Sequence, residues 1–342
     1  PGGQEPGLQP SLFAPGLVNT GLLTRDIALT PDGRELYFCQ ATSGYRYAVI
    51  LVTRKVGGQW TEPKVANFSG QPDWIDLEPC ISPDGRQFFF YSSRPAVAGG
   101  EPAQDIWVMD RQGDTWGPPR NLEAPVNTDA PEFFPSVTAD GTLYFCRADA
   151  QTGVHSQYRA RLADGQYQEP ELLPEEVNAG RTRFNAWVAP DESRLIIPVA
   201  GHPENHGGVD YWLSVRDSQD QWSGPFNLGP AVNDGSRGSW SPYLSPDGEV
   251  FFFMSGRTVG EPAAWPAAWS GLQEGHNRPG SGRSGIFWMD ASFLEEVASG
   301  REPAVEALET RVGSSAGTTI EWPELNGPYL GQKTPGLELS LI

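Results

Sequence analysis

Basic side chains are scarce in this sequence. It contains 24 lysines and arginines against 43 aspartates and glutamates, which gives a formal net charge of −19 over 342 residues. A surface this acidic repels phosphate groups, so nucleic acid and anionic membranes are poor partners, whereas cations and neutral ligands are better ones. Long apolar runs are also missing: no stretch approaches the roughly 20 residues that span a bilayer.

Cysteine is rare, and familiar catalytic motifs are absent. Of three cysteines, Cys39 and Cys146 each end an LYFC segment, Cys80 lies in EPCIS, and none has the spacing of metal ligands. We therefore expect small buried side chains at all three positions. The sequence also lacks a G-x-S-x-G elbow, an HExxH motif, a phosphate loop, a Rossmann glycine run and a CxxC pair. Motifs alone therefore assign no reaction.

Turn-forming and aromatic residues are abundant instead. The chain has 40 glycines, 32 prolines, 16 phenylalanines, 12 tryptophans and 10 tyrosines. Without a collagen period, this composition favours many short strands joined by tight turns. With 38% apolar residues the chain is globular, and its length suits two domains or one array of repeats.

A repeated turn indicates the array. Five segments share a short strand, a turn like Pro-Asp-Gly and an apolar strand: LTPDGRELYFCQ from residue 29, ISPDGRQFFFYS from 81, VTADGTLYFCRA from 137, VAPDESRLIIPV from 188 and LSPDGEVFFFMS from 244. Their turn aspartates are 52, 56, 51 and 56 residues apart: Asp32, Asp84, Asp140, Asp191 and Asp247. A strand-rich period near fifty residues is typical of a β-propeller.

Each repeat continues with the parts of a propeller blade. A variable loop, a strand such as DIWVMDRQ and a stretch such as TWGPPRNLEAPVN follow the apolar strand, which gives four strands per repeat. The fifth repeat ends instead in ASFLEEVA, a short helical pattern, and the missing stretch occurs before the first blade as PSLFAPGLVNTG, residues 10–21. The N-terminal segment is therefore predicted to supply the outer strand of the last blade and close the ring.

These units, SPDGRQFFFYSSR…DIWVMDR…WGPPRNL…VN, resemble the TolB-like WD-type β-propeller repeat of bacterial exported and periplasmic proteins over about residues 10–297. The resemblance implies an all-β, five-bladed propeller of four-stranded antiparallel blades in an exported, periplasmic or extracellular protein. Its superfamily includes binding and scaffold proteins, and lyases acting on acidic sugars occur on related propellers, so the fold does not decide the function.

The repeats predict the following organisation. Residues 1–297 form the propeller, with the closing strand at 10–20 and blades at about 24–70, 74–128, 130–179, 182–234 and 238–297. Residues 298–342 form a C-terminal linker and tail.

The last residues repeat the first ones. GQKTPGLELSLI, residues 331–342, matches GQEPGLQPSLFAPG, residues 3–16, at seven positions with a one-residue gap. Two interpretations stay open. One is chance similarity in a sequence rich in proline and glycine. The other is a tail, residues 330–342, that docks by strand addition on a propeller edge of its own chain or of a neighbour.

Charged side chains just before the inner strands are predicted to gather at one face of the channel. The catalytic candidates are Asp26, Glu78 and Glu132. Converging carboxylates raise one another's pKa and can form acid and base pairs. The ligand-binding candidates at the same level are Asp76, Arg183, Asn185 and Arg237. The alternative is an internal network in which these groups pair with arginines and cap strand ends.

All four histidines lie in variable loops: His155, His202, His206 and His276. The candidate metal site combines two of them with two carboxylates, as His202, His206, Glu204 and Asp210. The channel carboxylates are also suited to bind a divalent cation such as calcium, which is the candidate cofactor. Against this, Pro203 argues that the loop is not helical, so the spacing of the two histidines does not place them on one face. Exposed loop histidines are the alternative.

The loop between residues 255 and 285 is far longer than a hairpin needs, as binding loops and lids often are. It carries Trp265 and Trp269, which suit sugar faces or a protein partner; the alternative is that they fold down over the channel. A recurrent arginine ends the second strand of three repeats, as Arg94, Arg147 and Arg257. We expect it to pair with Asp105 or Asp210.

Two functions follow as hypotheses. The first is a non-catalytic binding or assembly module that engages a glycan or a protein through its loop-bearing channel face. The alternative is a carbohydrate-active enzyme, a polysaccharide lyase or a glycosidase, that uses the channel carboxylates with or without a metal. The enzyme needs two carboxyl groups about 5–10 Å apart in an open pocket. Carboxylates that are each paired with arginine, together with a plugged channel, would exclude the enzyme.

Overall fold

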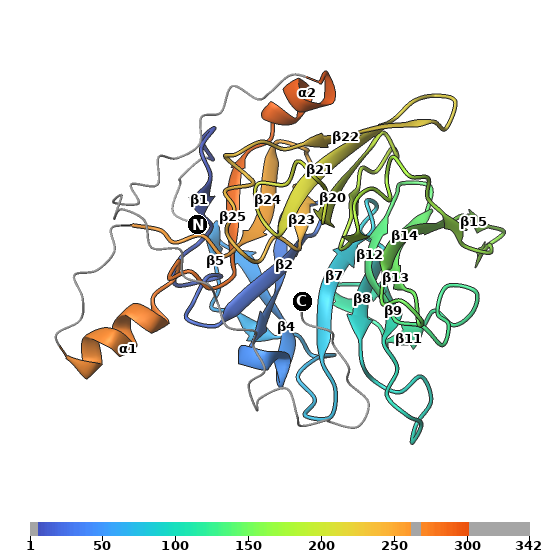
Figure 1. The fold of residues 1–342 in the computed structure, drawn as a ribbon. Helices are drawn as coiled ribbons and strands as arrows, with labels where there is room; N and C mark the ends of the chain where they lie inside the picture. Colours follow the sequence, from blue (N-terminus) through green and yellow to red (C-terminus); the bar gives the residue numbers. More distant parts are fainter. Residues whose placement is uncertain (1–5, 261–267, 301–342) are drawn as a thin grey trace.

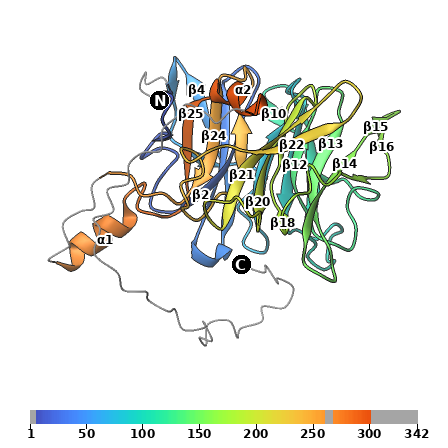
Figure 2. The same ribbon diagram turned by 45° about the horizontal axis from the view of Figure 1, so that its top comes forward.

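The computed structural model describes residues 6–260 and 268–300. Within these ranges five antiparallel sheets surround one axis as the blades of a five-bladed β-propeller, as the repeats predict (Figures 1 and 2). Five inner strands contact one another in chain order, and the last contacts the first: β2 (Leu23–Leu29), β7 (Asp76–Ile81), β12 (Glu132–Val137), β19 (Trp187–Val188) and β23 (Pro242–Leu244).

The first three blades follow the chain from the inside out. Blade one adds β3 (Glu35–Ala41), β4 (Ala48–Val56), β5 (Gln59–Trp60) and β6 (Lys64–Val65), with a 3₁₀ turn at Ser43–Tyr45. Blade two adds β8 (Gln87–Ser92), β9 (Asp105–Gln112), β10 (Thr115–Trp116) and β11 (Arg120–Asn121). Blade three adds β13 (Leu143–Ala148), β14 (His155–Ala160) and β17 (Glu171–Leu172); β15 (Leu162–Ala163) and β16 (Gln166–Tyr167) form a separate hairpin.

The last two blades differ at their ends. Blade four pairs β18 (Thr182–Arg183) and β19 with β20 (Arg194–Ala200), followed by β21 (Val209–Arg216) and β22 (Trp222–Asn227). Blade five consists of β23, β24 (Val250–Ser255), β25 (Gly285–Asp290) and β1 (Ser11–Leu12). Helix α2 (Phe293–Ala298) is the predicted ASFLEEVA helix and contacts β21 and β22. Helix α1 (Trp269–Asn277), in the long loop of blade five, stands away from the sheets in both views (Figures 1 and 2).

Runs of three aromatic residues in the second strands reflect burial on both faces of a blade. In β8, Phe88 and Phe90 pack with Tyr37 in the cluster between blades one and two, whereas Phe89 packs with Phe145 between blades two and three. Successive side chains of a strand point to opposite faces, so a strand between two neighbours needs no polar alternation. Five such clusters fill the five blade interfaces.

The N-terminal segment closes the ring, as predicted. In β1, Ser11 lies opposite Trp288 and Leu12 opposite Phe287, so the first strand of the chain is the outer strand of the last blade. Asn19 adds a second fastening, because its side chain donates to the Ile286 carbonyl and accepts from the Ile286 N–H, each at 2.9 Å.

The recurrent Val-Asn of the repeats makes the same contact in other blades. The Asn side chain bonds both backbone groups of one residue in the third strand, in the pairs Asn127 with Ile106, Asn178 with Gln157 and Asn233 with Tyr211. The amide of asparagine thus replaces a strand where the outer edge of the blade ends.

We expect Asn19→Ala to lower the free energy of unfolding by about 2 kcal/mol, because it leaves the buried Ile286 N–H without its acceptor. Urea denaturation measures the loss, and limited proteolysis should show earlier cleavage near the N-terminus. The control is Gln219→Ala, an exposed amide in a turn, which should change stability by less than about 0.5 kcal/mol. Equal stability of the two variants would contradict the fastening.

Candidate functional site

The inner strands carry a bulge at the same repeat position. Asp26, Glu78 and Phe134 have left-handed φ values of 50°, 61° and 51°, and each lies where the pairing register of its strand shifts. A bulge turns a side chain away from the regular alternation of the strand. All three predicted catalytic residues therefore lie within the inner strands rather than in front of them: Asp26 and Glu78 at bulges, and Glu132 at the start of β12.

These bulges support a polar network to which all five blades contribute. Arg25 bonds Asp26 and Glu78, with nitrogen–oxygen distances of 2.7 Å to each. The Glu78 carboxylate also accepts from the Phe134 N–H at 2.7 Å and from the Asn185 amide at 3.4 Å. The Asp26 carboxylate accepts from the Ser241 hydroxyl and from the Glu78 N–H. The network joins the inner strands to one another through side chains.

Burial sets the protonation of this network. The side chains of Asp26 and Glu78 are 1% and 6% exposed. Burial raises the pKa of Glu78 to about 7, opposed by the Arg25 charge and reinforced by the Asp26 charge. The folded protein therefore keeps a proton on Glu78 between its ordinary pKa of 4.5 and about 7, where the unfolded chain has lost it. The contribution of Glu78 to stability falls as pH rises through this window.

A second set of contacts latches each blade to the segment that precedes it. Arg94, Arg147 and Arg257 donate to the backbone carbonyls of Phe68, Val126 and Val232. In the other two blades Arg183 donates to the carbonyls of Asn178 and Gly180, and Gln40 to that of Val18. Each blade therefore has one long donor side chain that bonds the backbone of the segment preceding it.

The ionic partners of these arginines differ from the expected ones. Arg94 pairs with Asp76 at 2.6 Å and Arg147 with Glu132 at 2.7 Å, while Arg257 lies 3.3 Å from Asp234. The expected partners are engaged elsewhere: Asp105 accepts from the Asn121 amide, and Asp210 from the His206 N–H. The prediction of Asp105 or Asp210 was wrong, because Arg94 and Arg147 pair inward with the first strand of their own sheets. Arg257 pairs with a residue of the segment that precedes blade five.

Most predicted channel residues are thus held in internal bonds. The catalytic candidates Asp26, Glu78 and Glu132, and the ligand candidates Asp76, Arg183 and Asn185, are all buried. Arg237 differs from them, since its side chain is exposed. The structure does not place the paired carboxylates in an open pocket, which the enzyme hypothesis requires.

The histidine loop does not assemble its four predicted metal ligands. The His202 ring lies 4.0 Å, centroid to centroid, from the Trp212 ring, and its Nδ1 accepts from the Glu204 N–H. His206 Nδ1 lies 3.2 Å from the Asp210 carboxylate. In the described ranges no group of three or more His, Cys, Asp or Glu side chains is suited to a metal ion. Pro203 keeps the loop irregular, so the two histidines face different neighbours.

Of the two predicted tryptophans of the long loop, one lies within the described residues. Trp265 lies outside the described residues. Trp269 begins helix α1 and is 72% exposed, so it does not fold down over the blades.

A series of aromatic side chains was not predicted from the sequence: Phe133, His155, Phe184 and Trp240, which we call the aromatic arc. Neighbouring rings of the arc lie 5.0, 5.3 and 4.5 Å apart, edge to face, across blades three to five. All four side chains are partly exposed. Phe133, Phe184 and Trp240 occupy one repeat position, next to the central polar network. Alignment of that position could have revealed them, because three of five repeats hold an aromatic residue there.

Two arginines accompany the arc. Arg181 and Arg237 each lie three residues before an arc residue, Phe184 and Trp240 respectively, and both are exposed. Neither is ion-paired within the described residues. By contrast, the arginines around the Pro-Asp-Gly turns at the other end of the blades are held by carboxylates: Arg34, Arg54, Arg86, Arg111, Arg159, Arg194 and Arg216. The loop-bearing face therefore offers two cationic side chains without an ionic partner in the described residues, each three residues along the chain from an aromatic ring of the arc.

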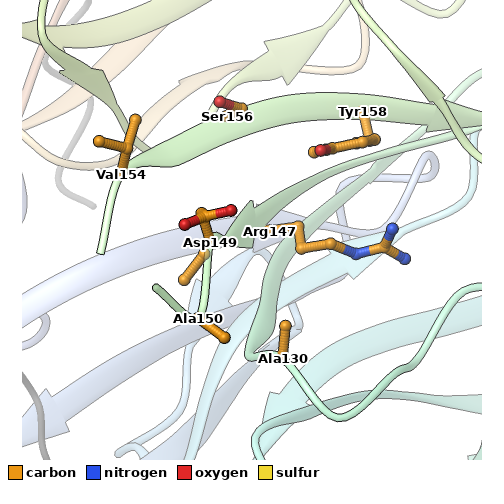
Figure 3. Close-up of a pocket in the computed structure, with 8 residues that line it drawn as sticks. Ala130, Arg147, Asp149, Ala150, Val154, Ser156 and Tyr158 are labelled. Carbon is orange, nitrogen blue, oxygen red and sulfur yellow. The ribbon is translucent and has the colours of Figure 1, made fainter. Parts of the chain in front are cut away.

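A pocket of about 150 Å³ lies at the loop end of blade three (Figure 3). Asp149 is the one carboxylate among its lining residues, and Arg147 extends its guanidinium group away from Asp149. Asp149 itself accepts from the N–H groups of Gln151 and Thr152. A single carboxylate that fixes its own loop does not supply the acid and base of glycoside cleavage.

Comparison with known proteins supports the fold. The sequence matches no family model and no curated protein. A solved structure described as a glycoside hydrolase shares 10% identity over 89% of this chain and 95% of its own, with a TM-score of 0.51. A thermostable family-43 glycoside hydrolase shares 13% identity over 82% and 92%, with a TM-score of 0.46.

TolB from Acinetobacter baumannii shares 16% identity over 79% of this chain, with a TM-score of 0.41. The chain spans 55% of the length of that protein. At such identities the likeness concerns the fold alone. No helix among the described residues is long and apolar enough to cross a membrane.

Proposed function

We propose that this chain is an exported, non-catalytic binding propeller that holds a glycan on its loop-bearing face. The aromatic arc carries the proposal, together with the exposed Arg181 and Arg237, which lie three residues from Phe184 and Trp240 in the sequence. Sugar rings present apolar C–H faces that pack on aromatic rings, and arginine donors bond hydroxyl or carboxylate groups of the same ligand. Both kinds of group are partly or fully exposed here, on elements fixed by the blades.

The state of the carboxylates supports binding rather than turnover. Asp26 and Glu78 share Arg25, and Glu132 is held by Arg147. The contacts of Asp26 and Glu78 join different blades, and those of Glu132 lie within blade three and the segment before it. An approaching sugar therefore meets no exposed acid and base pair at these positions.

We expect Trp240→Ala to weaken glycan binding at least about tenfold, since truncating a central aromatic side chain removes its stacking surface. A panel of neutral and acidic polysaccharides, screened by affinity electrophoresis and followed by calorimetry, identifies the ligand and measures the loss. Because Trp240 also packs on Phe184, Arg237→Ala serves as a second variant that leaves the aromatic packing intact and should weaken binding several-fold.

The matched control is Trp269→Ala, an exposed tryptophan on helix α1, which should bind like the unmodified protein. If the loss follows Trp269 instead, the long loop of blade five with Trp265 and Trp269 is the binding surface. If no polysaccharide binds, the glycan proposal fails and a protein partner on this face replaces it.

A second function, cleavage of a polysaccharide, has one observation in its favour. The pKa of Glu78, raised by burial to about 7, is in the range of a general acid at neutral pH. Product analysis of the same incubations separates the two functions. New reducing or unsaturated ends that disappear in Glu78→Gln would make the protein a glycosidase or lyase, with or without a divalent cation.

The remaining proposals concern the whole chain. Export is proposed on the resemblance of the repeats, and residues 298–342 are proposed as a linker and tail. The docking of residues 330–342 on a propeller edge stays a proposal as well; most of this linker and the whole tail lie outside the described residues.

A further inference from the structure

The N-terminal segment of the chain pairs with the outer edge of β25. β25 has six residues, Gly285–Asp290, and β1 pairs in register with two of them. Two further backbone bonds extend this contact: Phe13 N–H donates to Ile286, and Asp290 N–H donates to the Gly7 carbonyl, both at 2.9 Å. The residues that hold β25 through their backbone are therefore Gly7, Ser11, Leu12 and Phe13.

The tail repeats the residues that make this contact. In the alignment of residues 331–342 with residues 3–13, Gly336, Ser340 and Leu341 correspond to Gly7, Ser11 and Leu12. Ile342 falls at the position of Phe13, which is buried between Phe252 and Trp288. Leu12 packs on the cluster between blades four and five. Both the backbone partners and the apolar anchors of the strand are thus present a second time in the sequence.

One difference in sequence favours pairing by the tail segment over pairing by β1. β1 begins directly after Pro10, and proline fixes φ, lacks an N–H and restricts the residue before it. The tail has Leu339 at that position, so LELSLI runs without proline from Leu337 to Ile342. An uninterrupted segment can pair with more of the six residues of β25 than the two that β1 covers.

We propose that residues 336–342 of one copy of this chain bind the β25 edge of a second copy in place of its residues 7–13. The displaced copy keeps its ring closed, because Asn19 still holds Ile286 by two hydrogen bonds. The exchange is a strand addition between identical chains, in which main-chain bonds give affinity and the side chain of Leu341 gives specificity. It involves a surface other than the aromatic arc, and so it does not depend on the glycan proposal.

The test compares two leucines of the tail in the full chain. Leu341→Asp replaces the residue that corresponds to the packed Leu12, whereas Leu337→Asp replaces the counterpart of Leu8, which is 58% exposed. Light scattering over a concentration series should show assemblies larger than a monomer for the unmodified chain and for Leu337→Asp, and a monomer for Leu341→Asp. A monomer at every concentration for the unmodified chain overturns the proposal, as does equal loss of assembly in both variants.

A photo-crosslinking amino acid at position 340 locates the contact. In a mixture of isotopically labelled and unlabelled chains, the proposal requires crosslinks from position 340 to Gly285–Asp290 of the other copy. Crosslinks only within one copy, or only to other blades, overturn it. Glycan binding by Leu341→Asp should equal that of the unmodified chain, so the two proposals fail separately.

Discussion

Arg25→Met is expected to lower the free energy of unfolding by roughly 3–5 kcal/mol at pH 8, because it leaves two buried carboxylates without their counter-ion. Arg25 is 11% exposed and bonds both Asp26 and Glu78 at 2.7 Å. Without its charge one of the two carboxylates must take up a proton to stay buried. Urea denaturation at pH 8 measures the loss.

The same substitution should cost less at pH 5. The pKa of Glu78 is already raised to about 7 by burial, so this group carries a proton in the folded protein at pH 5 with or without Arg25. Between pH 5 and pH 8 the stability contribution of Glu78 falls with rising pH, and removal of Arg25 steepens that fall. The double variant Arg25→Met, Glu78→Gln has no carboxyl to protonate at position 78 and should lose this extra pH dependence.

Arg34→Met is the control for this pair of measurements. Arg34 lies 3.8 Å from Asp32, and both side chains are more than half exposed, so the loss should stay below about 1 kcal/mol at both pH values. If Arg25→Met costs the same at pH 5 and pH 8, Glu78 does not titrate as the geometry requires.

The second large effect is expected for Arg147→Met, at roughly 3 kcal/mol or more. Arg147 is the counter-ion of Glu132, whose side chain is fully buried and whose pKa is raised by burial. It also donates to the Val126 carbonyl of the preceding segment at 2.9 Å and stacks on Tyr158. The substitution therefore leaves the buried Glu132 carboxylate without its counter-ion and removes the bond between blade three and the segment before it. Thermal and urea unfolding measure the change.

Two companion variants separate these contributions. Adding Glu132→Gln to Arg147→Met removes the unpaired charge and should restore at least about 1 kcal/mol, while the lost latch remains. Arg120→Met removes a surface pair with Asp110, 3.5 Å apart, and should be nearly neutral. A loss in Arg147→Met no larger than in Arg120→Met would show that the latch does not join the blades.

The candidate site was harder to predict than the fold. The sequence placed Asp26 and Glu78 near the axis but not their shared partner, because Arg25 and Glu78 are 53 residues apart and belong to different blades. It also treated Arg183 as a ligand group, whereas Arg183 replaces the latch that Arg94 and Arg147 provide in other blades. Alignment shows which positions repeat, but not which contact each repeat makes.

The repeat, the number of blades and the closing strand could all be predicted from the amino-acid sequence. These depend on local chemistry: Pro-Asp-Gly turns, apolar strands buried on both faces, and a Val-Asn segment that lies before the first blade instead of after the last. Which charged groups are held in internal ion pairs, and which are left without an ionic partner in the described residues, became clear from the three-dimensional arrangement of the blades. Glu78 meets Asn185, 107 residues away, because ring closure brings distant strands to one axis. Whether a carboxylate near the axis is available to a ligand or is held in a structural contact therefore depends on ring closure, and not on the residues next to it in the sequence.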